Sequence, residues 1–260
     1  MAPVAGAGAE RATWPDPWLF VLFGIGAVVM RGAGCTWNDI TDRDFDARVA
    51  RTASRPIPSG AVGLRGALVF LALQLAVGLA ILLSFNRFAV LVGAASLLLV
   101  FPYPFMKRIT WWPQAWLGLT FNWGALLGWS AASGVLATPA LLIYAAGLFW
   151  TLGYDTIYAH QDKEDDALIG VKSSARRLGA ATRPWLFGFY GIAVLLLAAS
   201  GWVAGLAWPW WLGLAAAAAQ LAWQAAAVDI DSPRDCLAKF KSNKWFGLIL
   251  LAAIVAAGRV

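Results

Sequence analysis

The run from Leu64 to Leu83 reads L-R-G-A-L-V-F-L-A-L-Q-L-A-V-G-L-A-I-L-L, and Arg65 is its single charged residue. Twenty residues of α-helix measure about 30 Å, which matches the hydrocarbon core of a bilayer. Because an α-helix pairs its backbone polar groups within its own segment, this run predicts a transmembrane helix.

Further apolar runs lie on both sides of it. Together the runs cover 17–37, 64–84, 87–106, 115–132, 139–158, 184–204, 208–228 and 245–257. The chain has 260 residues, of which 60% are hydrophobic and 13% charged, a composition that excludes a water-soluble globule. We therefore expect an all-α fold, a polytopic membrane bundle of about eight helices. It forms one domain over residues 1–260, with 1–16 as a non-spanning tail.

The charged residues are unevenly distributed between the two faces of this bundle. Sixteen of the twenty Lys and Arg residues fall in alternate loops, at 39–65, 107–114, 159–183 and 229–244. The positive-inside rule makes this face cytoplasmic, and we expect a bacterial inner membrane. Most acids lie at the same face, with the loops near 39–63 and 159–183 carrying the densest groups. A transporter usually places its functional acids at the midplane, so it stays the alternative from another class.

The first acidic motif is N-D-I-T-D-R-D-F-D, from Asn38 to Asp46. On a helix, Asn38, Asp42 and Asp46 step by four and share one face. Asp39 lies three residues before Asp42 and borders the same stripe. The motif therefore predicts a row of oxygen ligands on one side of a helix.

The second acidic motif is D-T-I-Y-A-H-Q-D-K-E-D-D, from Asp155 to Asp166. Its expected stripe consists of Asp155, Tyr158, Asp162 and Asp166. Four predicted helices separate the two motifs, so both return to the same face of the membrane. Asp42 and Asp46 match Asp162 and Asp166 at an offset of 120, which indicates two pseudo-repeated halves around a central cavity.

Carboxylates this close repel one another unless a cation lies between them. Mg²⁺ prefers oxygen ligands and commonly binds one or two carboxylates together with substrate phosphates. The motifs therefore predict Mg²⁺ sites that clamp a diphosphate; charged, solvated helix ends are the alternative interpretation. The expected metal ligands are Asn38, Asp39, Asp42, Asp46, Asp162 and Asp166.

These motifs resemble the UbiA superfamily of intramembrane prenyltransferases. R-T-A-S-R-P-I-P-S-G at 51–60, Y-P-F-M-K-R-I-T-W-W-P-Q at 103–114 and G-V-K-S-S-A at 170–175 are similar to its 4-hydroxybenzoate polyprenyltransferase branch. So is C-L-A-K-F-K-S-N-K-W-F-G at 236–247. The resemblance implies Mg²⁺-dependent transfer of a prenyl chain from polyprenyl diphosphate to a ring carbon of 4-hydroxybenzoate, an early step of ubiquinone synthesis. It implies these two substrates and the bilayer as partners, and no nucleic acid.

Basic and polar residues near the motifs are candidates for the other roles in this reaction. Arg51, Arg55, Tyr103, Lys107 and Lys172 are expected to contact the diphosphate, and Lys107, Arg108 and Asp155 to be catalytic. Arg31, Tyr158 and Asn122 are expected near the aromatic substrate. Each basic residue has a plainer explanation, since such side chains also snorkel to the interface or contact lipid headgroups. The family pattern favours function for Lys107 and Arg108.

Several alternatives remain at this stage. The same chemistry on homogentisate, a naphthoate or haem fits the composition equally, and only the 103–114 segment favours 4-hydroxybenzoate. A phosphatidyl-type transferase is disfavoured because its D-G-x-x-A-R opening is missing. The resemblance also implies nine helices, so we expect DNA upstream of Met1 to encode the missing first helix, opened by a basic residue and Pro. That helix would line part of the aromatic-substrate pocket.

Overall fold

The computed structural model describes residues 16–49 and 52–258, and every regular element in these ranges is helical. The α-helices are α1 Pro17–Asp46, α2 Leu64–Leu83, α3 Arg87–Ala95, α4 Leu97–Val100, α5 Met106–Ile109, α6 Pro113–Phe121, α7 Gly124–Ser133, α8 Thr138–Ala159, α9 Lys163–Leu168, α10 Ser174–Leu178, α11 Thr182–Val203, α12 Trp208–Ala227 and α13 Pro233–Ala257. The 3₁₀ turns are η1 Tyr103–Phe105, η2 His160–Asp162 and η3 Gly179–Ala181. The expectation of an all-helical bundle is confirmed.

In the part of the chain that the structure describes, six helical stretches are long and apolar enough to cross a membrane. They are Pro17–Asp46, Leu64–Leu83, Arg87–Ile109, Thr138–Leu168, Ser174–Val203 and Pro233–Ala257. The other two predicted runs are also helical: α12 has 20 residues, and α6 and α7 are separated by a break at Asn122 and Trp123. The chain is therefore a multi-pass membrane protein.

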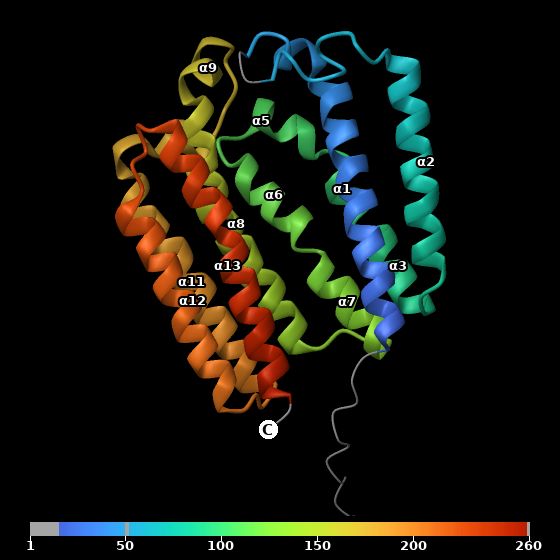
Figure 1. Ribbon diagram of the computed structural model, residues 1–260, viewed down its shortest axis with the longest axis vertical. Helices are drawn as coiled ribbons and strands as arrows, with labels where there is room; N and C mark the ends of the chain where they lie inside the picture. Colours follow the sequence, from blue (N-terminus) through green and yellow to red (C-terminus); the bar gives the residue numbers. More distant parts are fainter. Residues whose placement is uncertain (1–15, 50–51, 259–260) are drawn as a thin grey trace, which may run out of the picture.

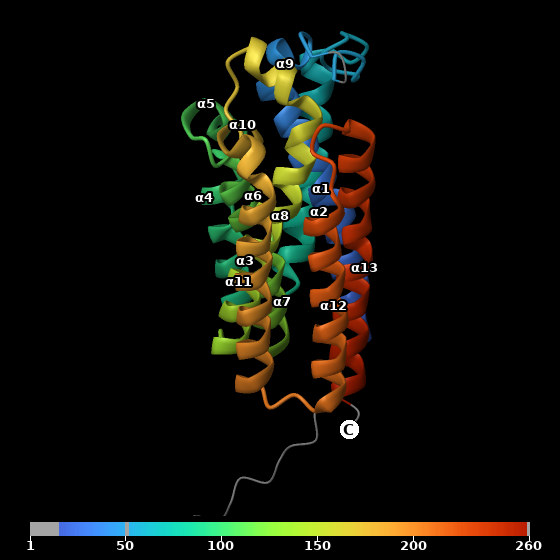
Figure 2. The same ribbon diagram turned by 90° about the vertical axis from the view of Figure 1, so that its left-hand side faces the viewer.

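The helices form two groups with a central layer between them (Figure 1). The antiparallel pair α1 and α2 lies on one side, and α11, α12 and α13 lie on the other. Helices α6, α7 and α8 lie between these groups, and the view turned by 90° shows the long helices running roughly parallel to one axis (Figure 2). Residues 1–15 of the predicted tail lie outside the described residues.

Local sequence explains where the helices begin. Asp16 accepts a hydrogen bond from the Trp18 backbone N–H at 2.8 Å, and Pro17 occupies the first helical position, where its missing N–H costs nothing. Ser232 caps α13 in the same way, with Pro233 following it. These short polar segments therefore set the entry of the chain into α1 and α13.

The last helix differs from its prediction. We expected an apolar helix near 245–257, and α13 instead begins at Pro233. Hydropathy missed its first turns because they contain Lys239 and Asn243, which the structure buries against the other helices rather than exposing to lipid. A membrane helix can therefore include polar residues where they pack against protein, and hydropathy alone does not detect such turns.

Packing is tightest between α8, α11, α12 and α13, where most of the buried apolar residues gather. Close approach of α8 and α11 depends on Gly153, because a Cβ there would lie 2.1 Å from the Tyr190 ring. By contrast, most side chains of α2 are exposed and only one of its twenty residues, Ala67, is buried, as expected for a helix that faces lipid. The C-terminal half therefore contains most of the buried apolar core among the described residues.

The charge distribution predicts the orientation of this bundle. In a background with Cys35→Ser and Cys236→Ser, expressed in the inner membrane of a bacterial host, cysteines introduced at Ser59 and Ala180 should react only with membrane-permeant reagents in intact cells. Ser84→Cys, at the opposite end of α2, should react with impermeant reagents as the matched control. Thiol labelling read by mass shift measures this, and the reverse pattern would contradict the orientation.

Candidate active site

Both acidic motifs lie at the same end of the bundle, the upper end in Figures 1 and 2. The first motif forms the last turns of α1, and the second runs from α8 through η2 into α9. Asn38, Asp42 and Asp46 all lie within α1, so the four-residue stripe predicted for this motif is confirmed. One end of the molecule thus collects the acids of both halves of the sequence.

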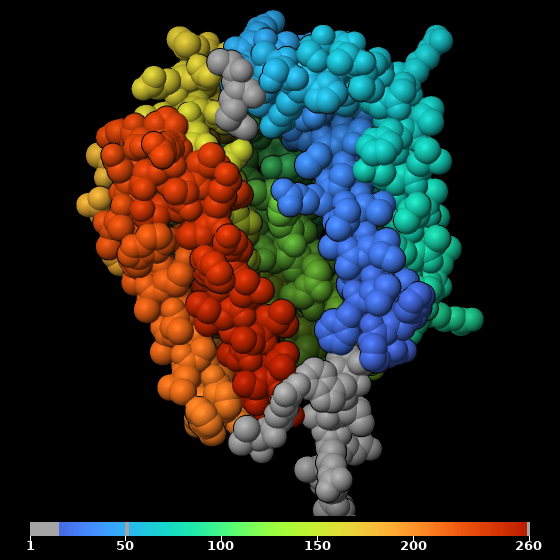
Figure 3. All heavy atoms as spheres, in the orientation of Figure 1, coloured from blue at the N-terminus to red at the C-terminus, as the bar shows by residue number. Residues whose placement is uncertain are grey.

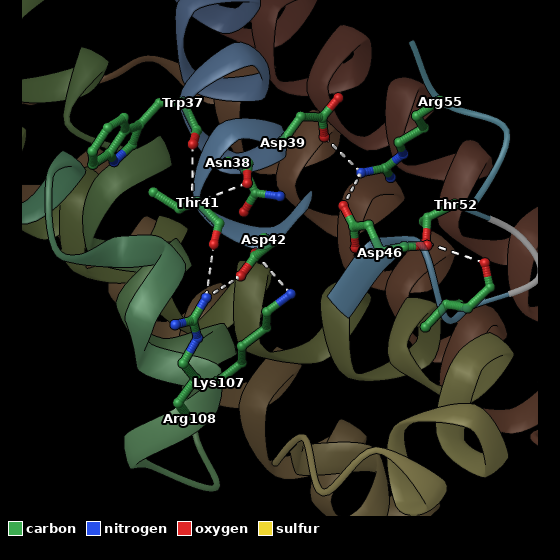
Figure 4. Close-up of polar contacts among 11 residues, drawn as sticks. Trp37, Asn38, Asp39, Thr41, Asp42, Asp46, Thr52, Arg55, Lys107 and Arg108 are labelled. Carbon is green, nitrogen blue, oxygen red and sulfur yellow. Dashed lines mark hydrogen bonds and ion pairs between the residues drawn. The ribbon is translucent and has the colours of Figure 1, made fainter. Parts of the chain in front are cut away.

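Asp42 is fully buried, at 0% exposure, and two cations neutralise it. Lys107 Nζ lies 2.7 Å from its Oδ2, and Arg108 Nη2 lies 2.9 Å from its Oδ1 (Figure 4). Arg108 also donates to the Thr41 carbonyl oxygen at 2.9 Å, and its guanidinium lies 4.6 Å from the centre of the Phe45 ring. Because a buried carboxylate is costly without such partners, the charges hold α5 against the end of α1.

The loop after α1 folds back over the same acids. Arg55 Nη1 donates to Asp39 Oδ1 at 2.8 Å and to Asp46 Oδ2 at 3.2 Å (Figure 4). Thr52 Oγ1 donates to the Asp46 carbonyl oxygen at 2.8 Å and fixes the turn. The loop therefore brings Arg55 to the first motif, whereas Arg51 lies outside the described residues.

The segment between α9 and α10 is tied to the segment that carries Lys107 and Arg108. The backbone N–H of Lys172 donates to the Lys107 carbonyl oxygen at 2.9 Å, and Lys172 Nζ donates to the Ile109 carbonyl oxygen at 3.0 Å. The Ser174 N–H donates to Gln114 Oε1 at 3.1 Å, so α10 is joined to α6 as well. Lys172 therefore positions α5, in addition to any role toward substrate.

The first motif has oxygen ligands that suit a divalent cation. A single nitrogen of Arg55 already bridges Asp39 and Asp46, which means that these two carboxylates share one positive charge. Their oxygens, with those of Asn38 and Asp42, are the ligands that Mg²⁺ prefers. Among the described residues, no three His, Cys, Asp or Glu side chains converge on one point. A cation here would complete its shell with other ligands, such as phosphate oxygens, as Mg²⁺ commonly does.

The second motif differs from the predicted stripe. We expected Asp155, Tyr158, Asp162 and Asp166 on one α-helix. The structure inserts η2 between α8 and α9, and Asp162 has φ −111° and ψ 9°, outside the α-helical region. The tighter winding of a 3₁₀ turn goes with burial of His160, whose Nε2 lies 2.9 Å from Thr182 Oγ1. Asp162 and Asp166 therefore project from a bent segment.

An exposed ion pair joins this bent segment to the loop before α13. Lys163 Nζ lies 2.5 Å from Asp231 Oδ1, and this hydrogen bond holds the pKa of the Asp231 carboxyl below its usual range. Both groups are solvated, so the pair contributes little to stability. Its effect is to orient the segment that carries Asp162.

The other predicted residues lie between the acidic end and the middle of the bundle. Asp155 lies one turn before the end of α8, and no other described side chain donates a hydrogen bond to its carboxylate. Tyr103 begins η1, and its ring centre lies 6.4 Å from that of Phe121. Arg31 is exposed and lies three turns of α1 deeper than Asp42. The ring centre of Tyr158 lies 4.5 Å from that of Phe240.

Asn122 occupies the break between α6 and α7. Its Nδ2 donates to the Gly118 carbonyl oxygen and to Thr151 Oγ1, each at 2.8 Å. A Cβ on Gly147 would lie 2.2 Å from Asn122 Oδ1, so this glycine makes room for the amide. Asn122 is thereby held at the wall of a cavity rather than turned toward lipid.

That cavity has a volume of about 370 Å³ and lies between α6, α7, α8 and α13, with Leu197 of α11 and Trp210 of α12 also in its lining. Its described lining is apolar apart from Asn122 and the indole N–H groups of Trp150 and Trp210. On the molecular surface a groove runs between α13 and α1, and residues of the central helices form its floor (Figure 3). An apolar space therefore lies beneath the charged end.

Sequence analysis missed residues that line or support this cavity. Trp150 and Asn243 are joined by a hydrogen bond of 2.8 Å across α8 and α13. The signal was present, since Asn243 is a polar residue within a segment that also carries a family-like motif. Polar residues at membrane depth are functional candidates by default.

A family model and several relatives in other organisms match this chain over most of its length. The family model described as the UbiA prenyltransferase family matches residues 1–254. The chain is 52% identical over 248 residues to the mitochondrial 4-hydroxybenzoate polyprenyltransferase of Arabidopsis thaliana, covering 95% of this chain and 61% of that protein. It is 50% identical over 251 residues to the human protein of that name, covering 96% and 68%. The chain spans 61% of the length of the Arabidopsis relative and 56% of the Aedes aegypti one.

Solved structures share this fold. A UbiA homologue from Aeropyrum pernix K1, in its apo form, superimposes with a TM-score of 0.79 at 27% identity, covering 93% of this chain and 90% of that one. A UbiA homologue from Archaeoglobus fulgidus, bound to GPP and Mg²⁺, gives a TM-score of 0.68 at 18% identity, covering 93% and 89%. At that identity the second likeness shows the fold alone.

The charge balance around Asp42 predicts a stability effect. Asp42→Asn should lower the free energy of unfolding by about 2 kcal/mol, because Lys107 and Arg108 would lose their counter-charge. The loss falls below the roughly 3–5 kcal/mol typical of a broken buried pair, since both cations are partly exposed. Asp44→Asn is the control from the same motif, because the Asp44 side chain is 78% exposed. Thermal unfolding in detergent measures both, and equal effects would contradict the interpretation.

Proposed function

The chain belongs to the UbiA prenyltransferase family, and we propose that it transfers a polyprenyl group from polyprenyl diphosphate to a ring carbon of 4-hydroxybenzoate, a step of ubiquinone biosynthesis. The observation that carries the proposal is the pairing of Lys107 and Arg108 with a buried acidic motif above an apolar cavity. Relatives named for this reaction match almost the whole of this chain.

The acidic end binds the diphosphate. Lys107, Arg108 and Arg55 place positive charge beside the first motif, where negative charge grows on the departing diphosphate. Asn38, Asp39, Asp42 and Asp46, together with Asp162 and Asp166 of the second motif, would hold Mg²⁺, which when bound neutralises phosphate oxygens. Arg51, Tyr103 and Lys172 are proposed to complete the diphosphate site.

The apolar middle accommodates the prenyl chain and excludes water. As the C1–O bond of the prenyl diphosphate breaks, the allylic carbon becomes electron-poor and would react with any water that reaches it. An apolar cavity at membrane depth protects it until the ring carbon of the acceptor forms the new C–C bond.

The acceptor lies between these regions. Arg31 pairs with its carboxylate, and Tyr158 and Asn122 border its ring. Asp155 accepts the proton that the ring carbon loses, or the phenol proton, because its carboxylate receives no hydrogen bond from another described side chain. This division of roles leaves the diphosphate and the acceptor at opposite sides of the reacting carbon.

The orientation of the protein can be argued without knowing which kind of membrane contains it. The relatives reported above are named as mitochondrial proteins, so the expectation of a bacterial inner membrane has no support from them. In either kind of membrane we propose that the acidic end faces the inner side, as the Lys and Arg distribution indicates.

Removal of the metal ligands should abolish the reaction. Membranes that contain the protein, supplied with Mg²⁺, a polyprenyl diphosphate and labelled 4-hydroxybenzoate, should form a prenylated product. EDTA, Asp42→Ala or Asp162→Ala should lower its rate by at least about a hundredfold. Asp44→Asn and Glu164→Gln, which alter exposed acids of the same motifs, should keep most of the activity.

The same assay tests the acceptor. Homogentisate, a naphthoate and haem should give no product under these conditions, and preferred turnover of one of them would replace 4-hydroxybenzoate in the proposal. Full activity in EDTA, or in both alanine variants, would contradict the two-motif site.

The role of Asp155 gives a different kinetic result. Asp155→Asn should reduce kcat by about 10²–10⁴-fold and leave the KM for the prenyl diphosphate within about twofold, because a general base acts on the chemical step. Steady-state rates at varied pH check this. An unchanged kcat would exclude Asp155 as the proton acceptor.

A further inference from the structure

Five aromatic rings form a continuous wall along the facing sides of α8 and α13. In order of contact they are Tyr158, Phe240, Tyr154, Trp150 and Phe246. The ring centres are 4.5 Å apart for Tyr158 and Phe240, 5.6 Å for Phe240 and Tyr154, 5.0 Å for Tyr154 and Trp150, and 4.7 Å for Trp150 and Phe246. At 1.5 Å of rise per residue, the eight residues from Tyr158 to Trp150 give this aromatic wall a length of about 12 Å.

The aromatic wall connects the charged end to the apolar cavity. Its outer ring, Tyr158, lies four residues before Asp162 of the second acidic motif. Its inner rings, Trp150 and Phe246, line the cavity of about 370 Å³. An elongated apolar chain that has its head at the acidic end would therefore run along this wall.

A side chain from the neighbouring helix fixes the orientation of the Trp150 ring. Its Nε1 donates to Asn243 Oδ1 at 2.8 Å. Asn243 is itself buried, and its Nδ2 donates to the Phe240 carbonyl oxygen at 3.0 Å. The bond satisfies the only polar atom of the indole, so the ring can present an apolar face to the cavity.

More buried polar groups stand behind Asn243. Gln224 is fully buried, accepts a hydrogen bond from the Tyr190 hydroxyl at 2.9 Å and donates to Ser242 Oγ at 3.0 Å. Burying amides at membrane depth is costly unless they are paired, so a network of this kind indicates a purpose beyond packing. The network meets the cavity wall where Trp150 Nε1 donates to Asn243 Oδ1.

We propose that Asn243 is a positioning residue that fixes Trp150 as one side of the prenyl-tail channel, and that this hydrogen bond makes the enzyme bind long prenyl tails in preference to short ones. The inference rests on the proposed function, which supplies the prenyl diphosphate. Without the bond, the indole can change rotamer and enter the cavity that the tail needs. Because Trp150 lies about 14 Å below the acidic end of α8, a single isoprene unit does not reach it.

Binding of unreactive thio analogues tests this separately from turnover. Dissociation constants of dimethylallyl and geranylgeranyl thiodiphosphate, measured with Mg²⁺ on the whole chain in detergent, give the preference for the longer tail. Asn243→Leu and Trp150→Phe should each reduce that preference about fivefold, the effect of one lost hydrogen bond. The double variant should lose no more than either single one, because both remove the same bond.

Tyr190→Phe is the matched control, since it removes a hydrogen bond of the same network without bordering the cavity. It should keep the preference of the unsubstituted protein. A merely structural role for Asn243 would weaken both analogues equally, or not at all, and either result overturns the proposal. Additive losses in the double variant overturn it as well.

Failure of the analogue-binding experiment can be told apart from failure of the proposed reaction. If the unsubstituted protein binds both analogues and yet prenylates no acceptor, the proposed reaction fails while the tail preference still decides the role of Asn243. Trp150→Phe, which keeps a ring at this position, decides it alone if Asn243→Leu does not accumulate in the membrane.

Discussion

A carboxylate that water cannot reach needs positive charge beside it, and the burial of Asp42 imposes this requirement on the whole acidic end. The charge comes from Lys107 and Arg108, on the short helix α5. Helix α5 can turn back toward α1 because Pro102 and Pro104 interrupt the helical stretch Arg87–Ile109 just before it. A proline break in an apolar segment is thus what allows two cations to meet a buried acid.

The same requirement links the two halves of the sequence. Backbone and side-chain hydrogen bonds of Lys172 hold α5 from the opposite side, and Ser174 joins Gln114 at the start of α6. This segment follows α9, which carries the end of the second acidic motif. Charge neutralisation in the first motif therefore depends on the fold of the segment that follows the second, which suits a site that binds one diphosphate from both sides.

Below the acidic end the physical problem is reversed, since a reactive allylic carbon and its tail need an apolar, dry space. The central helices supply it with alkyl side chains and with the aromatic wall. The polar network around Gln224 and Asn243 lies behind this wall rather than within the cavity. Buried polarity is thereby used to orient a ring, without placing a charge near the prenyl chain.

The sequence by itself determined the membrane fold, the position of most helices and the shared face of Asn38, Asp42 and Asp46, because hydropathy and helical spacing are local properties. It missed the first turns of α13 and the bend at η2, where polar residues face protein and local winding follows tertiary contacts. Only the tertiary structure decided which cations meet which acids, and which ring Asn243 holds. Arg108 lies 66 residues from Asp42, and Asn243 lies 93 residues from Trp150. Partners at such separations are set by how whole helices pack, and no local pattern records that.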